Sequence, residues 1–227
     1  MARRDQFLVI GLGRFGGALA EDLIAHGHEV LGIDASPKLV QTYAQRLTHV
    51  VEMDSTDLEA MRQLGAGDFE VAVVAIGTEV EASILTTSVL VDLGIPRIVA
   101  KAISEPHGKI LSRVGAHRVV FPERDMGLRV ARSLAGRDVI DYMELDPGFV
   151  LLETKAPPAL VGRTLAEAEV RRRFGLTVVS VKGEGKPATY ATPETRVEEG
   201  DILVIAGETQ RVEEFVQLRE SPKRPRV

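Results

Sequence analysis

The sequence predicts an α/β fold in which a doubly wound parallel sheet is followed by a smaller α+β lobe. Short apolar runs alternate with amphipathic stretches up to Pro122, and a glycine-rich turn, 11–16, separates the first apolar run from the first amphipathic stretch. The alternation changes after residue 137. Strands that alternate with helices form parallel sheets, because each helix returns the chain to the same edge. We therefore expect a Rossmann-like first domain.

Six apolar runs are expected to form this sheet: 7–10, 30–33, 49–53, 71–76, 97–100 and 118–121. The helices between the strands are expected near 16–26, 37–46, 57–64, 79–93 and 105–114. Ser36 before Pro37 and the run Ser55-Thr56-Asp57 are typical helix starts, since these side chains accept hydrogen bonds from free N–H groups and proline loses none there. A further helix, 124–135, is expected to cross to the second lobe.

The second lobe carries a different pattern. We expect strands at 148–154, 176–181 and 201–206 and helices at 164–174 and 208–218. The predicted domains are 1–137, a nucleotide-binding domain that includes the crossover helix, and 138–218, a dimerisation or effector domain, with a basic tail at 219–227. A unit this small buries little surface, so pairing with a second copy is expected to stabilise it.

Composition excludes several classes. The net charge is −5, which argues against nucleic acid as a partner, and there is no cysteine for disulfides or thiolate chemistry. No apolar run approaches the roughly 18 residues that a membrane span needs. We therefore expect a cytoplasmic protein, and this pattern leaves docking on a membrane component open.

The glycine-rich turn has the chemistry of a phosphate site. Gly11 permits the tight strand-to-helix turn, Gly13 leaves room for phosphates, and Gly16 lets the helix pack closely on the strand. The free amides and the positive end of the helix dipole then face an anion. Asp34 ends the second strand, where a carboxylate accepts hydrogen bonds from a ribose diol and repels a 2′-phosphate. The pattern favours NAD or adenosine nucleotides over NADP.

Further polar residues follow later strands. Asp54 and Ser55 are placed to contact a base edge, Gly77 to allow close ligand approach, and Lys101 to neutralise phosphate. All four lie at carboxyl ends of strands, the edge at which open parallel sheets bind ligands. Caps and turns explain Ser55 and Gly77 equally well.

Two charged residues have alternative interpretations. Arg14 lies within the glycine turn, where it reaches a phosphate or is a solvated residue that the helix dipole disfavours. Glu123 caps the crossover helix or holds a cation beside the phosphates.

A dehydrogenase that used this fold would need a catalytic pair. None of the three tyrosines is followed four residues later by lysine, and no two of the five histidines have i, i+4 spacing. We therefore expect a protein that is not an enzyme. An NAD-dependent oxidoreductase and an NAD(H)-binding redox sensor are the alternatives.

Several segments together carry a family resemblance: 11–17, 27–31, 33–34, 74–77, 85–87, 115–119 and 122–127. In these the chain resembles the KtrA and TrkA family, most closely its KtrA branch. The family's members are cytoplasmic regulators of bacterial potassium uptake built from RCK domains. The likeness covers the chain up to the tail.

The resemblance implies a dimer that assembles into an octameric ring beneath a membrane-embedded Ktr- or Trk-type cation channel subunit. ATP would favour the active ring and ADP the inactive one. Arg14 would sense the γ-phosphate, Asp34 would bind ribose, and Glu123 would hold Mg²⁺, Ca²⁺ or Na⁺. Arg171 matches an arginine of the pocket in which the family binds cyclic di-AMP.

The candidate cofactor-binding residues lie mostly in the first domain: Gly11, Gly13, Arg14, Phe15, Gly16, Asp34, Ala35, Lys38, Asp54, Ser55, Ala75, Ile76, Gly77, Lys101, Glu123 and Arg171.

Overall fold

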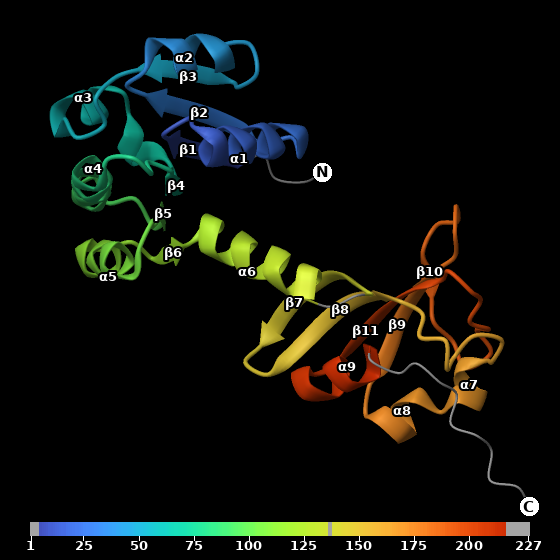
Figure 1. Cartoon of the computed structure of the whole chain (residues 1–227). Coiled ribbons are helices and arrows are strands. Elements are labelled where there is room, and N and C mark those ends of the chain that lie inside the picture. The colour runs from blue at the N-terminus through green and yellow to red at the C-terminus, as the bar shows by residue number, and fades with distance from the viewer. Residues whose placement is uncertain (1–4, 136–137, 217–227) are drawn as a thin grey trace, which may run out of the picture. The chain divides into compact units, whose positions relative to one another are not determined.

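The structure, a computed structural model, describes residues 5–135 and 138–216. The chain forms two compact units, one up to Arg124 and one from Asp125 onward (Figure 1). The first unit contains a parallel sheet with the strand order β3-β2-β1-β4-β5-β6. The predicted doubly wound fold is confirmed.

The elements of the first unit follow the expected alternation. Its strands are β1 (Gln6–Ile10), β2 (Glu29–Asp34), β3 (His49–Glu52), β4 (Val71–Val74), β5 (Arg97–Lys101) and β6 (Arg118–Val120). Its helices are α1 (Arg14–Ala25), α2 (Pro37–Tyr43), α3 (Leu58–Gln63), the short 3₁₀ helix η1 (Ala66–Asp68), α4 (Val80–Asp92) and α5 (Glu105–Val114). The helix α6 (Pro122–Ala135) begins in this unit and continues in the second.

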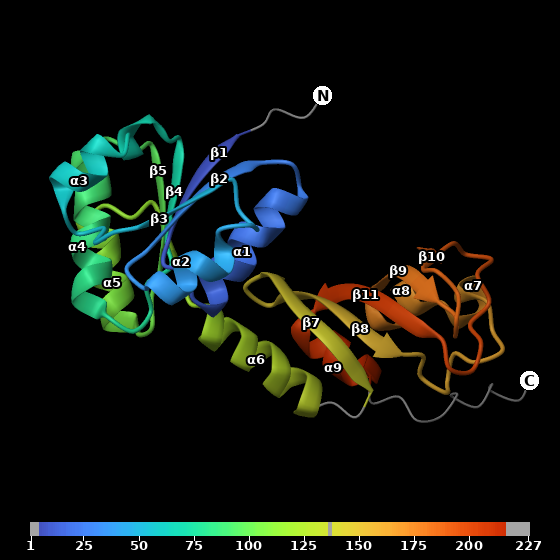
Figure 2. The ribbon, with the colours of Figure 1, turned by 90° about the horizontal axis from the view of Figure 1, so that it is seen from above.

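Both faces of the sheet are covered. Helices α1 and α2 lie on one face, and α3, α4 and α5 lie on the other (Figure 2). Along β1, Leu8 and Ile10 pack into one buried cluster and Val9 packs into the opposite one. Side chains alternate between the faces of a strand, so a strand buried on both faces must be apolar throughout. The continuous apolar runs of the sequence reflect this burial.

The second unit is built on an antiparallel sheet with the strand order β10-β9-β11-β8-β7. Its strands are β7 (Val139–Asp146), β8 (Phe149–Lys155), β9 (Thr177–Lys182), β10 (Thr189–Tyr190) and β11 (Ile202–Glu208). Its helices beyond α6 are α7 (Leu165–Ala168), α8 (Val170–Phe174) and α9 (Thr209–Val216). Phe215 of α9 is fully buried and meets Phe174 edge to face, with 5.3 Å between the ring centroids.

Three features of this unit differ from the expectation, and one of them is the two-residue strand β10, which was not predicted. Strand β7 was not predicted, because Ile140, Met143 and Leu145 are exposed on it and Tyr142 is its buried large side chain, which obscures the alternation. The helix expected over 164–174 is two short helices. Glu169 separates them with φ +48°, a left-handed conformation that a continuous helix cannot contain.

The expected domain boundary after residue 137 stays a prediction, since the compact units divide within α6. The basic tail, 219–227, lies outside the described residues. Within the part of the chain that the structure describes, no helix combines the length and apolar character needed to cross a bilayer.

The predicted cap at Asp57 provides a local test of the fold. Its Oδ1 accepts hydrogen bonds from the backbone N–H groups of Glu59 at 2.9 Å and Ala60 at 3.1 Å. Asp57→Ala is expected to lower the free energy of unfolding by about 1 kcal/mol, because two first-turn N–H groups lose their acceptor. Urea denaturation measures this loss. Asp57→Asn, which keeps an acceptor oxygen, is the matched control, and an equal loss in both variants would contradict the capping role.

Candidate nucleotide site

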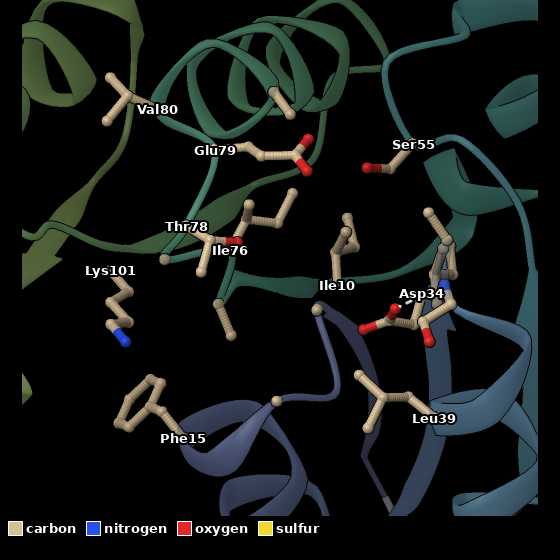
Figure 3. Close-up of a pocket in the computed structure, with 18 of the residues that line it drawn as sticks. Ile10, Phe15, Asp34, Leu39, Ser55, Ile76, Thr78, Glu79, Val80 and Lys101 are labelled. Atoms are coloured by element: carbon tan, nitrogen blue, oxygen red, sulfur yellow. Dashed lines mark hydrogen bonds between the residues drawn. The ribbon is translucent and has the colours of Figure 1, made fainter.

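A cavity of about 1300 Å³ opens at the carboxyl edge of the parallel sheet in the first unit (Figure 3). Its walls come from the loops that follow β1, β2, β3 and β4, together with Lys101 at the end of β5 and Glu123 after β6. Asp34 and Leu39 lie at one end of the cavity, and Lys101 and Phe15 lie at the other (Figure 3). This is the edge at which open α/β sheets bind ligands.

The glycine loop has the geometry that a close ligand approach requires. Gly11 has φ +91°, and a Cβ on Gly16 would lie 1.9 Å from the carbonyl oxygen of Gly11. A Cβ on Gly13 would meet no protein atom within 4 Å, so Gly13 faces open space. Gly13 is also the N-cap of α1 and provides no side-chain acceptor. The first-turn N–H groups of α1 therefore lack a side-chain cap and are suited to bind an anion.

Asp34 ties the glycine loop to the second strand. Its Oδ2 accepts a hydrogen bond from the N–H of Leu12 at 2.7 Å, and its Oδ1 accepts one from the N–H of Ser36 at 2.8 Å. Each carboxylate oxygen can accept a second hydrogen bond. Because Asp34 also lines the cavity, those remaining positions are available to a ribose diol.

At the opposite end, Lys101 and Glu123 form an ion pair. The Lys101 ammonium donates to Glu123 Oε1 at 2.5 Å and lies 5.9 Å from the centroid of the Phe15 ring. The Lys101 side chain is 10% exposed, whereas that of Glu123 is 61% exposed. The hydrogen bond from Lys101 lowers the pKa of Glu123, and the charge of Arg14 contributes in the same direction.

The residues after β3 are hydrogen-bonded within the protein. Asp54 accepts hydrogen bonds from the N–H of Thr56 at 2.9 Å and from its hydroxyl at 2.7 Å, and these bonds lower the pKa of Asp54. The Ser55 hydroxyl pairs with that of Thr86 at 2.7 Å. Both Asp54 and Ser55 still line the cavity.

Most of the candidate residues converge on this cavity. Those that line it are Gly11, Gly13, Arg14, Phe15, Asp34, Ala35, Asp54, Ser55, Ala75, Ile76, Gly77, Lys101 and Glu123. Gly16 packs behind the loop, against Gly11 and Ala75. Lys38 is exposed on α2 outside the lining residues, and Arg171 lies on α8 in the second unit.

Sequence reasoning missed the apolar wall. Leu39, Met53, Leu85 and Ile103 also line the cavity. Met53 and Ile103 follow β3 and β5 closely, so their positions at strand ends were a usable signal. Leu39 and Leu85 lie on helices, and only the packing of those helices brings them to the cavity.

The described residues do not form a cation site on their own. No cluster of three or more metal-ligating side chains occurs among residues 5–135 and 138–216, and Glu123 is paired with an ammonium group. Cation binding at Glu123 therefore stays a prediction.

Comparison with known families accounts for both units. Residues 7–122 match the TrkA-N domain, and residues 149–219 match the TrkA-C domain. The Ktr system potassium uptake proteins A and C of Bacillus subtilis (strain 168) are each 38% identical to this chain over 213 residues. The alignments cover 94% and 93% of this chain, respectively, and 96% of each relative. The chain belongs to the KtrA and TrkA family. The resemblance inferred from its motifs is confirmed.

Solved structures agree with this family's fold. The RCK domain of GsuK superposes with a TM-score of 0.68 over 98% of this chain and 49% of that chain, at 21% sequence identity. The GsuK channel bound to NAD superposes with a TM-score of 0.67 over 98% of this chain and 41% of that chain, also at 21% identity. This family member therefore spans about half or less of the GsuK chains, and the likeness concerns the fold.

Proposed function

We propose that this chain is a nucleotide-sensing regulatory subunit that gates a potassium channel or transporter, with ATP favouring the active ring and ADP the inactive one. The observation that carries the proposal is a cavity lined both by the glycine loop and by Asp34 at the end of β2. The N–H groups at the start of α1, directly after this loop, have no side-chain cap. Family membership supplies the potassium-uptake context, since the Bacillus subtilis relatives are named as Ktr system potassium uptake proteins.

ATP and ADP differ by one phosphate and its charge. A ligand shifts a conformational equilibrium only through its different affinities for the two states. Arg14 lines the cavity at the first turn of α1, where the helix dipole disfavours a cation and a bound phosphate would stabilise it. We infer that ring conformations which place Arg14 at different distances from the terminal phosphate respond differently to the two nucleotides. Helix α6 is our candidate for the moving link.

We further propose that the chain assembles as a dimer and then as an octameric ring, at the cytoplasmic face of the membrane beneath a Ktr- or Trk-type channel subunit. The second unit exposes apolar side chains on two elements: Met126, Leu128, Val130 and Leu134 on α6, and Ile140, Met143 and Leu145 on β7. Exposed apolar side chains that gather on two consecutive elements of the chain favour binding to a protein partner, which would bury them. A second copy of the chain is the proposed partner.

The chain is proposed not to be an enzyme, and NAD or NADH is the alternative ligand. The ribose of NAD would satisfy Asp34 as well as that of ATP, and the fold neighbour GsuK is described as bound to NAD. Cyclic di-AMP at Arg171 and a cation at Glu123 remain further proposals, and no step of the gating proposal depends on either.

Calorimetric titration with ATP, ADP, NAD and NADH, with and without Mg²⁺, tests the proposed function. Arg14→Ala is expected to weaken ATP binding about tenfold, because a charge-assisted hydrogen bond to phosphate is lost, and to change ADP binding much less. Arg46→Ala is the matched control, since Arg46 pairs with Glu21 and is not among the residues that line the cavity. Tight NADH binding without ATP binding would overturn the proposal in favour of a redox sensor or an enzyme.

A further inference from the structure

The two members of the Lys101–Glu123 ion pair differ in how far they are exposed to solvent. Lys101 is a largely buried cation, whereas the carboxylate that neutralises it is mostly in solvent. Gly77 keeps this corner open, because a Cβ there would lie 2.9 Å from the Lys101 ammonium nitrogen. The ammonium has three N–H donors, and the structure gives it the single hydrogen bond to Glu123 among the residues described. Lys101 is thus a cation that faces the cavity with donor capacity left over.

The sheet order sets the distance from the ribose position to Lys101. Asp34 ends β2, the glycine loop follows β1, Gly77 follows β4, and Lys101 ends β5. These strands are consecutive neighbours in the order β2-β1-β4-β5. Three strand spacings of about 4.8 Å place the ends of β2 and β5 about 14 Å apart. A ribose on Asp34 therefore puts the first phosphate at the glycine loop, and a second or third phosphate extends toward Lys101.

We propose that a phosphate beyond the first takes the Lys101 ammonium from Glu123, so that this pair discriminates nucleoside di- and triphosphates from monophosphates and releases Glu123 at the start of α6. This inference rests on the proposed nucleotide site and adds to it a specificity-determining residue and the group that it exchanges.

The exchange is physically reasonable because each partner keeps a favourable environment. Leaving the buried Lys101 ammonium without an anion would cost free energy. In the proposed exchange the ammonium replaces a carboxylate with a phosphate and therefore stays paired. Glu123 moves from a paired to a fully solvated state at little cost, since its side chain is already 61% exposed. Two anions on one ammonium would repel each other, which favours exchange over simultaneous binding. Glu123 is in the first turn of α6, so its release removes the ion pair between that helix and β5, while the ion pair of Arg124 with Glu105 remains.

Titrations of AMP, ADP and ATP in EDTA test the exchange on the whole chain of 227 residues. The variants are Glu123→Gln, Lys101→Gln and the double variant, each checked for folding by circular dichroism. Lys101→Gln is expected to weaken ADP binding roughly 30-fold, and Glu123→Gln to tighten it roughly fivefold, because the competing anion is gone. AMP affinity is expected to change less than about twofold in both variants, since its phosphate does not reach Lys101.

The double variant separates exchange from simple repulsion. If Glu123 competes for Lys101, Glu123→Gln has no further effect on ADP affinity once Lys101 is glutamine. An equal tightening in that background would show that Glu123 only repels the phosphate, and this would overturn the proposal. Weakened ADP binding by Glu123→Gln alone would overturn it as well. The comparison of ADP with AMP in Glu123→Gln remains decisive if Lys101→Gln fails to fold.

Amide hydrogen–deuterium exchange provides a second measurement, and a purely structural role of Glu123 would leave its rates unchanged on nucleotide binding. ADP, but not AMP, is expected to speed exchange at the amides of 126–130 in the wild-type chain, and Glu123→Gln to show the faster exchange without any nucleotide. Unchanged exchange in both cases would contradict the release of Glu123. If the wild-type chain binds none of the nucleotides, the proposed nucleotide site itself fails. If it binds them without these differences, only the exchange at Lys101 fails.

Discussion

Gly16→Ala is expected to lower the free energy of unfolding by about 3 kcal/mol or more. The added Cβ would lie 1.9 Å from the carbonyl oxygen of Gly11 and 2.8 Å from the Cβ of Ala75. Both neighbours belong to the tight corner between β1, α1 and β4, and the nearer one is backbone, which cannot rotate away. Helix α1 would therefore have to move off the sheet. Thermal and urea denaturation followed by circular dichroism measure the loss.

Gly13→Ala is the matched control and separates packing from binding. Its Cβ would meet no protein atom within 4 Å, and the Gly13 backbone has φ −67°, which alanine adopts without strain. This variant is expected to unfold like the wild type but to bind ADP at least about tenfold more weakly, because the methyl group occupies the space of the phosphate. Normal ADP binding by Gly13→Ala would show that phosphates do not approach the loop here.

Asp34→Ala is expected to weaken ATP binding about 30-fold or more and to lower the free energy of unfolding by about 2 kcal/mol. Binding falls because the ribose hydroxyls lose a charged acceptor. Stability falls because the N–H groups of Leu12 and Ser36 lose their partner, and Leu12 is fully buried. Calorimetry with ATP and urea denaturation measure the two losses separately.

A ligand analogue isolates the ribose contact from the structural one. The wild-type chain is expected to bind 2′,3′-dideoxy-ATP more weakly than ATP, whereas Asp34→Ala should bind the two alike. Asp54→Ala is the control, because Asp54 is a second carboxylate of the same cavity whose hydrogen bonds go to Thr56. It should keep the wild-type preference for ATP. An Asp34→Ala variant that still prefers ATP would place the ribose elsewhere.

The first unit was predictable to within a few residues of each element boundary. Its central strands are buried on both faces, so they appear in the sequence as continuous apolar runs such as 7–10 and 30–33. Helices α2 and α3 begin after the expected residues Ser36 and Asp57, although Asp57 makes a side-chain cap and Ser36 makes none. The second unit was predicted less well. Exposed apolar residues on β7 and the left-handed Glu169 break the periodicities on which such predictions rest.

The sequence by itself determined the sheet, the glycine loop and the position of Asp34, because all three depend on local spacing within one βαβ unit. Only the tertiary structure decided that Lys101 pairs with Glu123, 22 positions further along the chain, and that Leu39 and Leu85 complete the cavity wall. These contacts depend on how neighbouring strands align and on which face each helix presents. Such long-range packing leaves no periodic signal in the sequence.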